Sequence, residues 1–233
     1  MSVRMDNDHA KVLIVDDHAF LRRGLAEIID DLPDAVVCGE AAGVAEALEQ
    51  IEHCQPDVVV IDISLADGNG LDLTREIKSH WPEIKILVSS MHDEALFAER
   101  ALRAGALGYV SKSDDVETFI AALRRVLEGQ ISLSQRMTNR LLNRVVAGGS
   151  SPTRSPLEAL SNRELEVFEL IGNGRSTKEI ASQLDLSRKT IETYREHIKA
   201  KLKLRNGSEL TRQAMQWVYE RSTSESPAGV DAS

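Results

Sequence analysis

Residues 57–70 have the sequence DVVVIDISLADGNG, in which a short apolar run ends at a carboxylate and turn-forming residues follow. Val58 to Ile61 is a run of β-branched residues, which is the pattern of a buried strand. From Leu71 to Ser79, apolar residues recur at spacings of three and four, as in a helix with one apolar face. The stretch therefore predicts a buried strand, a polar turn that begins at Asp62, and a helix.

The same strand-then-helix pattern occurs five times in the first half of the chain. Apolar runs predict strands at Val12–Val15, Val36–Gly39, Val58–Ile61, Ile84–Val88 and Gly108–Val110. Amphipathic stretches predict helices at Phe20–Ile29, Val44–Ile51, Leu71–Ser79, Ala95–Ala104 and Val116–Leu127. Strict alternation favours right-handed crossovers that place helices on both faces of a sheet. We therefore predict an α/β fold with a doubly wound, five-stranded parallel sheet.

Charge is distributed unevenly along the 233 residues, whose formal net charge is −9. Residues 1–129 have 12 Lys and Arg against 25 Asp and Glu, a net charge of −13, whereas residues 130–233 have 16 against 12, a net charge of +4. An acidic half disfavours nucleic acid, and a basic half favours phosphates. An aromatic content of only 4% argues against an aromatic-rich all-β fold or a base-stacking surface. We expect two domains with different functions.

The two cysteines, Cys38 and Cys54, are sixteen residues apart and have no further His or Cys at metal-ligand spacing. We expect buried, reduced thiols and predict neither a metal site nor a disulfide there. The first ten residues are polar and charged, and no run of eighteen apolar residues follows. These features predict a cytoplasmic protein.

Polar residues stand where the predicted strands of the first half end: Asp16, Asp17, Asp62, Ser89, Ser90 and Lys112. Because ligands bind beyond the carboxyl ends of parallel strands, we expect these side chains to share one pocket. Carboxylates this close repel one another by roughly several kcal/mol per pair, so positive charge must offset them. Lys112 supplies one charge. Magnesium, which prefers carboxylate and carbonyl oxygens and retains waters, fits the remainder.

Residues 10–128 resemble the receiver domain of two-component response regulators of the NarL/FixJ subfamily. The motifs that carry the resemblance are VLIVDDH from Val12 to His18, DVVVIDISLADGNG from Asp57 to Gly70, LVSSMHD from Leu87 to Asp93 and AGALGYVSKS from Ala104 to Ser113. The resemblance implies a flavodoxin-like domain with strand order 2-1-3-4-5. It also implies a receiver that takes a phosphoryl group from a sensor histidine kinase and is not an enzyme.

The resemblance also implies a role for each pocket residue. Asp62 would be the phosphoacceptor, and magnesium would be held by Asp16, Asp17, Asp62 and the Ser64 carbonyl. Lys112 would pair with the phosphoryl group, and Ser90 would supply the family's hydroxyl, with Ser89 as the alternative. Tyr109 would be the aromatic switch, whose ring turns inward when the Ser90 hydroxyl moves toward the phosphoryl oxygens; ordinary packing is the alternative.

One position departs from the family pattern, because Ala66 stands four residues after Asp62, where relatives have proline. We expect a less rigid loop with altered kinetics and not the loss of phosphorylation. A variant that is regulated without phosphorylation is the alternative.

Residues 129–156 predict a linker between the two domains. A stretch compatible with a short helix, from Gln135 to Val146, runs into AGGSSPTRSP, whose Gly, Ser and Pro resist packing. This segment is either a tether that lets the domains meet and separate or a passive spacer. Residues 220–233 predict a disordered tail.

The second half predicts four short helices. Two Ser-x-x-Glu capping boxes, at Ser161 and Ser176, begin helices that extend to about Ile171 and Leu184. Gly172 and Gly174 would end the first of these. Ser187 caps a helix that extends to about Leu202, and Asn206 or Ser208 begins a last helix that reaches Tyr219.

In the third of these helices, one face is expected to pack through Ile191, Tyr194, Ile198 and Leu202. From Ser187 to Arg205 there are seven basic residues and two acidic ones, a net charge of +5, which is typical of a helix that lies against phosphates. A solvated charged face would be the default interpretation without the surrounding sequence.

That surrounding sequence, LSNRELEVFELIGNGRSTKEIASQLDLSRKTIETYREHIKAKLKL, resembles the LuxR-type helix-turn-helix over residues 157–219. The resemblance implies a helix-turn-helix from Ser176 to Arg195, with a scaffold helix at Thr177–Leu184 and a recognition helix at Ser187–Lys203. The expected DNA contacts are Lys178, Lys189, Thr193 and Lys199. Glu192 and Glu196 would either accept hydrogen bonds from cytosine amino groups or weaken binding by repelling phosphates.

The last helix is implied to be a dimer contact through Leu210, Ala214, Trp217 and Val218, although Trp217 could equally belong to the core. The whole chain thus predicts a transcription factor that binds promoter DNA as a homodimer when phosphorylated. The alternatives are a protein-interaction module that uses the same helices as a docking surface, and a metal-dependent phosphatase that uses the acidic pocket.

Overall fold

The computed structural model of the chain describes residues 9–146 and 156–223. It forms two compact units that divide between positions 150 and 151. Most of AGGSSPTRSP and the end of the predicted tail lie outside the described residues. Among the described helices, none is both long enough and apolar enough to cross a membrane.

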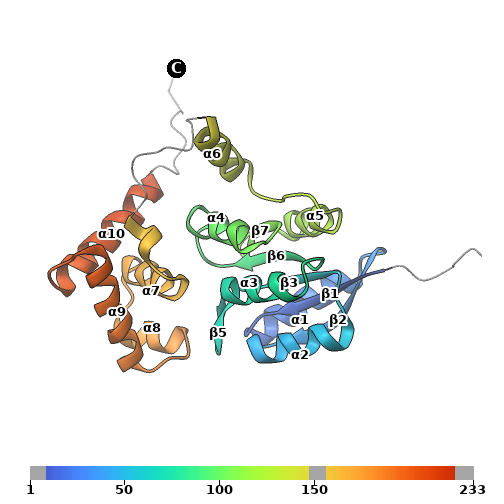
Figure 1. The fold of residues 1–233 in the computed structure, drawn as a ribbon, viewed down its shortest axis with the longest axis horizontal. Helices are drawn as coiled ribbons and strands as arrows, with labels where there is room; N and C mark the ends of the chain where they lie inside the picture. The colour runs from blue at the N-terminus through green and yellow to red at the C-terminus, as the bar shows by residue number, and fades with distance from the viewer. Residues whose placement is uncertain (1–8, 147–155, 224–233) are drawn as a thin grey trace, which may run out of the picture. The chain divides into compact units, whose positions relative to one another are not determined.

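The first unit is built on the parallel sheet that the sequence predicts (Figure 1). Its strands are β1 (Ala10–Val15), β2 (Ala35–Ala41), β3 (Val58–Ile61), β6 (Lys85–Ser90) and β7 (Gly108–Ser111). They lie in the order β2-β1-β3-β6-β7, and each neighbouring pair is parallel. This confirms the doubly wound α/β fold and the 2-1-3-4-5 order, since β6 and β7 are the fourth and fifth strands of this sheet.

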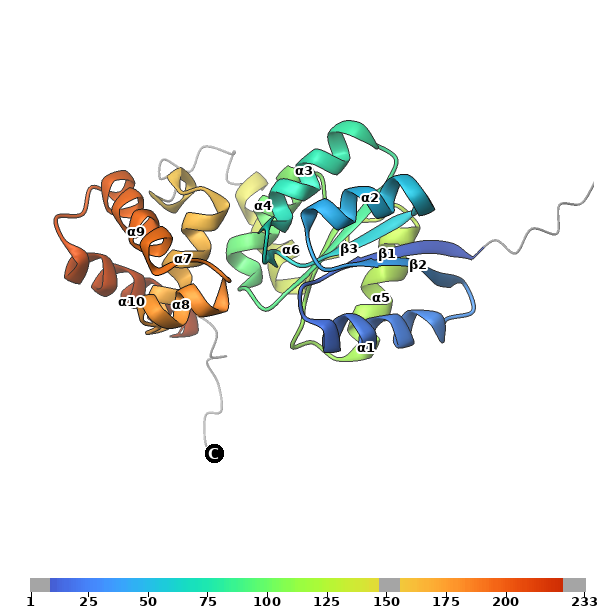
Figure 2. The same ribbon diagram turned by 90° about the horizontal axis from the view of Figure 1, so that it is seen from below.

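Helices cover both faces of the sheet: α1 (Ala19–Asp30), α2 (Val44–Cys54), α3 (Gly70–His80), α4 (Glu94–Ala104) and α5 (Val116–Leu127). Figure 2 shows α1 and α5 on one face and α2 and α3 on the other. Apolar residues of α1 and α5, such as Ile29 and Leu123, pack onto Val12, Ile14 and Val60 of the central strands with no exposed area or almost none. Burial on both faces explains why these strands are continuous apolar runs instead of alternating patterns.

A small hairpin follows β3, and the sequence pattern did not predict this hairpin. Strands β4 (Ser64–Leu65) and β5 (Gly68–Asn69) pair antiparallel, which leaves Ala66 and Asp67 as a two-residue turn. Strands of two residues carry no periodicity, so sequence pattern gives no signal for them.

Part of the predicted linker packs onto the first unit. Ser132 bridges to β7, because its carbonyl accepts from Tyr109 N at 2.9 Å and its N–H donates to the Leu107 carbonyl at 2.9 Å. Helix α6 spans Gln135–Val146, the stretch predicted to be helical, and Met137 on it is buried. This part of the linker is therefore anchored to the sheet domain.

The second unit is all-helical, with η1 (Pro156–Ala159), α7 (Asn162–Gly172), α8 (Thr177–Gln183), α9 (Arg188–Leu202) and α10 (Gly207–Thr223). Both predicted capping boxes are present, at Ser161 and Ser176, and Ser187 caps α9 by accepting from Thr190 N. Asn206 caps α10, since its Oδ1 accepts from Glu209 N at 2.9 Å. The last helix continues to Thr223, four residues into the predicted tail.

Candidate functional site

Strands β1 and β3 lie side by side, and two carboxylates come together at their carboxyl ends. The two strands pair from Val12↔Val58 to Val15↔Ile61, so Asp16 and Asp62 follow equivalent positions. Asp62 N donates to the Val15 carbonyl at 2.8 Å, and Asp16 N donates to the Ala41 carbonyl at 3.0 Å, which extends the ladder to the two acidic residues. Both are buried, with 2% of Asp16 and 4% of Asp62 exposed.

Lys112, just past β7, lies between these carboxylates. Its Nζ is 2.6 Å from Asp16 Oδ2 and 2.7 Å from Asp62 Oδ2, and its side chain is 4% exposed. Burial raises the pKa of Asp62 above its usual value, and the Lys112 ammonium offsets part of this rise. Burial by itself lowers the pKa of Lys112, but the Asp62 and Asp16 carboxylates outweigh it, so this pKa lies above its usual value. The lysine is therefore held as an ammonium ion.

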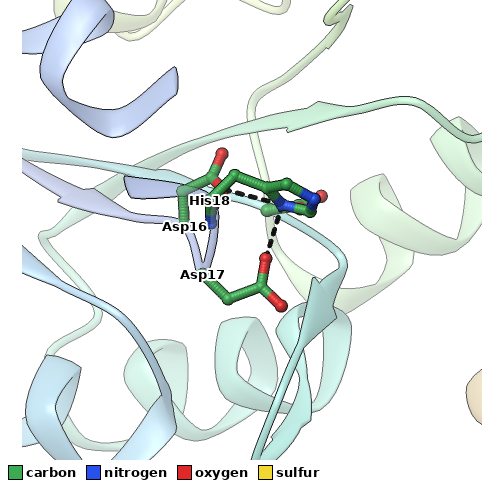
Figure 3. Close-up of side chains that lie close together, drawn as sticks. Asp16, Asp17 and His18 are labelled. Carbon is green, nitrogen blue, oxygen red and sulfur yellow. Dashed lines mark hydrogen bonds and ion pairs between the residues drawn. The ribbon is translucent and has the colours of Figure 1, made fainter. Parts of the chain in front are cut away.

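Asp17 and His18 follow Asp16 in the chain, and their side chains lie close to it (Figure 3). Ligand atoms of Asp16, Asp17, His18 and Asp62 all lie within 4.8 Å of one another. Among the described residues, Asp17 Oδ1 is the one buried side-chain polar atom without a hydrogen bond, and the contact that it does make is an ion pair with His18 Nδ1 at 2.6 Å. An unsatisfied buried carboxylate oxygen beside two more carboxylates fits a hard divalent cation.

Two further pocket predictions, Ser90 and Tyr109, are linked through His92. Ser90 Oγ accepts from His92 N at 3.2 Å, and the Tyr109 hydroxyl donates to the His92 carbonyl at 2.6 Å. The imidazole ring of the same histidine lies with its Nε2 2.9 Å from Ser64 Oγ. The Tyr109 ring is buried. His92 therefore joins the Ser64 loop to the end of β6, a role that the sequence analysis missed because the contact spans 28 residues.

The loop after Asp62 is tied to α2 by Asp67. Gly43, the N-cap of α2, has no side chain, and Asp67 replaces it: its carboxylate accepts from Val44 N at 2.8 Å and from Ala45 N at 3.2 Å. A Cβ on Gly43 would lie 2.4 Å from Asp67 Oδ1, so a side chain at this position would displace the Asp67 carboxylate. The loop expected to be loose because of Ala66 is thus held by a side chain one residue further on.

The end of the same loop is packed against the backbone of Asp62. A Cβ on Gly70 would lie 1.9 Å from the Asp62 carbonyl oxygen, a distance that no side chain could tolerate. Gly70 is the first residue of α3. The residue before it, Asn69, caps the helix, because its Oδ1 accepts from Leu71 N at 3.0 Å. The position of the Asp62 backbone therefore depends on a glycine eight residues later.

In the second unit, three of the four residues predicted to contact DNA are exposed: Lys178, Lys189 and Thr193. Ile191 and Ile198, on the opposite face of α9, have no exposed area, as the helical spacing predicts. The fourth, Lys199, is 19% exposed and its Nζ lies 2.8 Å from Glu196 Oε1. A contact from Lys199 to DNA would have to share its ammonium group with Glu196.

Two other charged residues of α9 hold the helices together. Glu192 accepts from Thr177 Oγ1 at 3.0 Å, which ties α9 to the start of α8. Lys201 donates to Glu164 Oε2 at 2.6 Å, in the capping box of α7. Burial raises the pKa of Glu164, but the bonds from Lys201 and Ser161 outweigh it and leave this pKa below its usual value.

The predicted dimer contact on α10 needs a correction. Leu210 and Ala214 have no exposed area, and a Cβ on Gly172 of α7 would lie 2.6 Å from the Ala214 carbonyl oxygen. Trp217 packs edge-on against Phe168 of α7, with ring centroids 6.1 Å apart. Leu210 and Ala214 are therefore core residues. The helical pattern identified an apolar face but could not say that α7 covers it.

Comparison with known proteins gives two family matches. The model of the response regulator receiver domain matches residues 12–124, and the model of the bacterial regulatory proteins of the luxR family matches residues 158–214. The oxygen regulatory protein NreC of Staphylococcus carnosus (strain TM300) is 37% identical over 209 residues, which cover 88% of this chain and 96% of NreC.

Two solved structures of RcsB are also similar. RcsB from Salmonella enterica serovar Typhimurium, bound to promoter rprA in the presence of the phosphomimetic BeF3−, is 26% identical with a TM-score of 0.58, over 88% of this chain and 97% of that one. A structure of two RcsB dimers bound to two parallel DNAs is 26% identical with a TM-score of 0.55, with the same coverage of both chains.

Proposed function

The chain belongs to the two-component response regulators that join a receiver domain to a LuxR-type DNA-binding domain, and we propose that Asp62 is its phosphoacceptor. One observation carries the proposal: Lys112 Nζ lies 2.7 Å from Asp62 Oδ2 in a buried pocket at the carboxyl ends of the strands. A fixed ammonium ion beside a nucleophilic carboxylate is suited to a reaction that brings a phosphoryl group to that carboxylate.

In the proposed reaction, an Asp62 carboxylate oxygen attacks the phosphorus of a phosphohistidine on a sensor kinase. The new O–P bond forms as the P–N bond breaks, and the electron pair of that bond leaves with the histidine nitrogen. Lys112 remains protonated and pairs with a phosphoryl oxygen. Ser90 Oγ, which now accepts from His92 N, would donate its O–H to another phosphoryl oxygen.

Magnesium is the proposed cofactor. Asp16, Asp17, Asp62 and the Ser64 carbonyl would hold it, and the bound ion would supply the positive charge that the equatorial phosphoryl oxygens need. The unsatisfied Asp17 Oδ1 supports this assignment, because a cation would compensate an oxygen that lacks a hydrogen bond.

The proposed output is promoter binding by a homodimer, controlled by phosphorylation in the cytoplasm. The RcsB structures support the proposal, since one is bound to promoter DNA with a phosphomimetic and the other contains dimers on DNA. The exposed Lys178, Lys189 and Thr193 are the proposed DNA contacts. On α10, a dimer contact would use exposed residues such as Met215 and Tyr219, because Leu210 and Ala214 are in the core.

Intact mass spectrometry tests the phosphoacceptor. The chain is incubated with a small-molecule phosphodonor, with and without magnesium, and compared with Asp62→Ala and with Asp57→Ala as a matched control outside the pocket. We expect the gain of one phosphoryl group in the wild type and in Asp57→Ala, dependent on magnesium and absent from Asp62→Ala. Equal labelling of Asp62→Ala would refute the assignment.

A salt titration tests the DNA contacts. Duplexes are selected from a random library with the BeF3−-treated chain, and their affinity is measured at several salt concentrations. If Lys189 contacts a phosphate, Lys189→Ala lowers the slope of log affinity against log salt by about 1, whereas Lys11→Ala, in the receiver, leaves it unchanged. An affinity that does not respond to salt would indicate a protein-docking surface instead.

A further inference from the structure

The two cysteines of the chain lie against each other, although the sequence predicts buried, reduced thiols and no disulfide. Cys38 is on β2 and Cys54 is the last residue of α2, and their Sγ atoms are 2.8 Å apart. Both are free and only half-buried. They are the only cysteines in the sequence. No part of the proposed phosphorylation or DNA binding uses them.

An irregularity in the sheet places Cys38 in this position. Strand β2 pairs with β1 as Val12↔Val37 and then as Leu13↔Gly39, so Cys38 is an extra residue opposite no partner. A bulge of this kind bends the strand and re-aims the side chain at the bulge, and it is rare between parallel strands. The one register shift in the β1–β2 ladder thus occurs at the residue whose sulfur meets Cys54.

Helix α2 lies close to the edge strand β2 beside Cys38. A Cβ on Gly39 would lie 2.8 Å from Gln50 Oε1 of α2, so the side chain of Gln50 lies close to the strand backbone next to Cys38. Lys11 Nζ donates to the Cys54 carbonyl at 3.3 Å, which fixes the end of the helix over β1. Strand β2 is at the edge of the sheet, so a small reagent can reach the pair.

We propose that Cys38 and Cys54 are a dithiol modification site that a small-molecule disulfide, such as oxidised glutathione, converts to an intramolecular disulfide. One cysteine thiolate attacks the external disulfide, which gives a mixed disulfide and releases one thiolate of the reagent. The second cysteine attacks the protein sulfur of the mixed disulfide and releases the other thiolate. Two protons and two electrons leave the protein, and the reagent takes the electrons.

The reactivity of the pair comes from closeness and not from an abundance of thiolate. Burial raises the pKa of Cys38 to about 12, with a further contribution from its contact with Cys54. Attack by the Cys38 sulfur is therefore slow at neutral pH, but the second sulfur is already in place when the mixed disulfide forms. Closure requires little backbone movement, because the side chains already point toward each other.

The test is the mass of the full-length chain after incubation with oxidised glutathione at mildly alkaline pH. We expect the wild type to lose two hydrogen atoms without retaining glutathione and to regain them with dithiothreitol. Cys38→Ser and Cys54→Ser, which keep the size of the side chain, should instead retain one glutathionyl group. Cleavage after glutamate, which cuts between the two cysteines at Glu40, Glu46, Glu49 and Glu52, should yield one cross-linked peptide pair.

A second measurement separates closure from damage to the fold. The oxidised wild type should have a Tm about 5 °C higher than the reduced form, because the cross-link restricts the unfolded chain. Three results would overturn the proposal: glutathione retained on both cysteines of the wild type, cross-links only between chains, or a folded pair that stays reduced while the chain in denaturant reacts.

Discussion

In the first unit, Lys112 lies between the buried carboxylates of Asp16 and Asp62, whereas on α9 in the second unit Lys189 is exposed. Both lysines are proposed to bind phosphate groups, Lys112 a phosphoryl group on the protein and Lys189 a nucleic acid backbone. The receiver pocket holds its charges in fixed positions before any ligand arrives. The Lys189 charge is solvated, and what it contributes appears only when a charged partner approaches.

This difference predicts how far each unit tolerates substitution. Charges removed from water depend on one another, so the loss of one partner leaves the rest uncompensated. Exposed charges contribute little to folding, typically under about 1 kcal/mol. The following substitutions test this contrast, in order of the expected effect.

The largest effect is expected for Lys112→Met, which leaves Asp16 and Asp62 without their shared cation. We expect the free energy of unfolding in urea to fall by about 3 kcal/mol without magnesium. Lys189→Met, the matched change on α9, should alter it by less than about 0.5 kcal/mol. Similar losses for the two variants would contradict the contrast between the units.

Gly70→Ala is expected to cost about 2 kcal/mol or more, because its Cβ would collide with the Asp62 carbonyl oxygen. Gly24→Ala in α1 is the control, since a Cβ there meets nothing within 4 Å. Alanine favours a helix interior, so Gly24→Ala should stabilise the fold by about 0.5 kcal/mol. Thermal or urea unfolding measures both, and opposite signs are the expected outcome.

Asp67→Ala should cost about 1 kcal/mol, because it removes the cap of α2 that Gly43 cannot provide. Gly43→Ser alone should also destabilise, since its Cβ would meet the Asp67 carboxylate. Combined with Asp67→Ala, the same serine has room and can cap α2 itself, so the double variant should be more stable than either single one. Additive losses in this double-mutant cycle would refute the interpretation.

The smallest effect, about 1 kcal/mol or less, concerns Glu164 in the second unit. Its pKa is below the usual value of 4.5, so the folded state keeps this carboxylate ionised more readily than the unfolded state does. The stabilisation is present above pH 4.5 and is lost as the pH falls through the folded-state pKa. The free energy of unfolding should be measured against pH for the wild type and for Glu164→Gln. The wild type should be the more stable of the two at pH 7, and this difference should disappear in acid.

Lys201→Met is the matched variant for this pH dependence, because Lys201 Nζ donates to Glu164 Oε2. Lys201→Met should lose less stability than the wild type when the pH falls from 7 into the acid range. If the wild type and Lys201→Met lost stability in parallel as the pH falls, the ion pair would not be the cause.

Much of the fold was predictable because its signals are local. Val58–Ile61 and Val116–Leu127 have the bounds that their patterns predict, and the Ser-x-x-Glu boxes at Ser161 and Ser176 begin helices as expected. The pocket was predictable for a related reason. Parallel strands end at one edge of the sheet, so polar residues that follow such strands meet without any knowledge of their distances.

The sequence by itself thus determined the order of strands and helices, the two-unit division and the group of residues around Asp62. Tertiary structure alone decided that Asp67 caps a helix more than twenty residues before it, that a bulge turns Cys38 toward Cys54, and that Leu210 and Ala214 are buried in the core. The physical reason is how far apart in the sequence the interacting residues lie. Hydrophobic period and capping act within a few residues, whereas these contacts depend on strand register and helix packing, which distant parts of the chain set together.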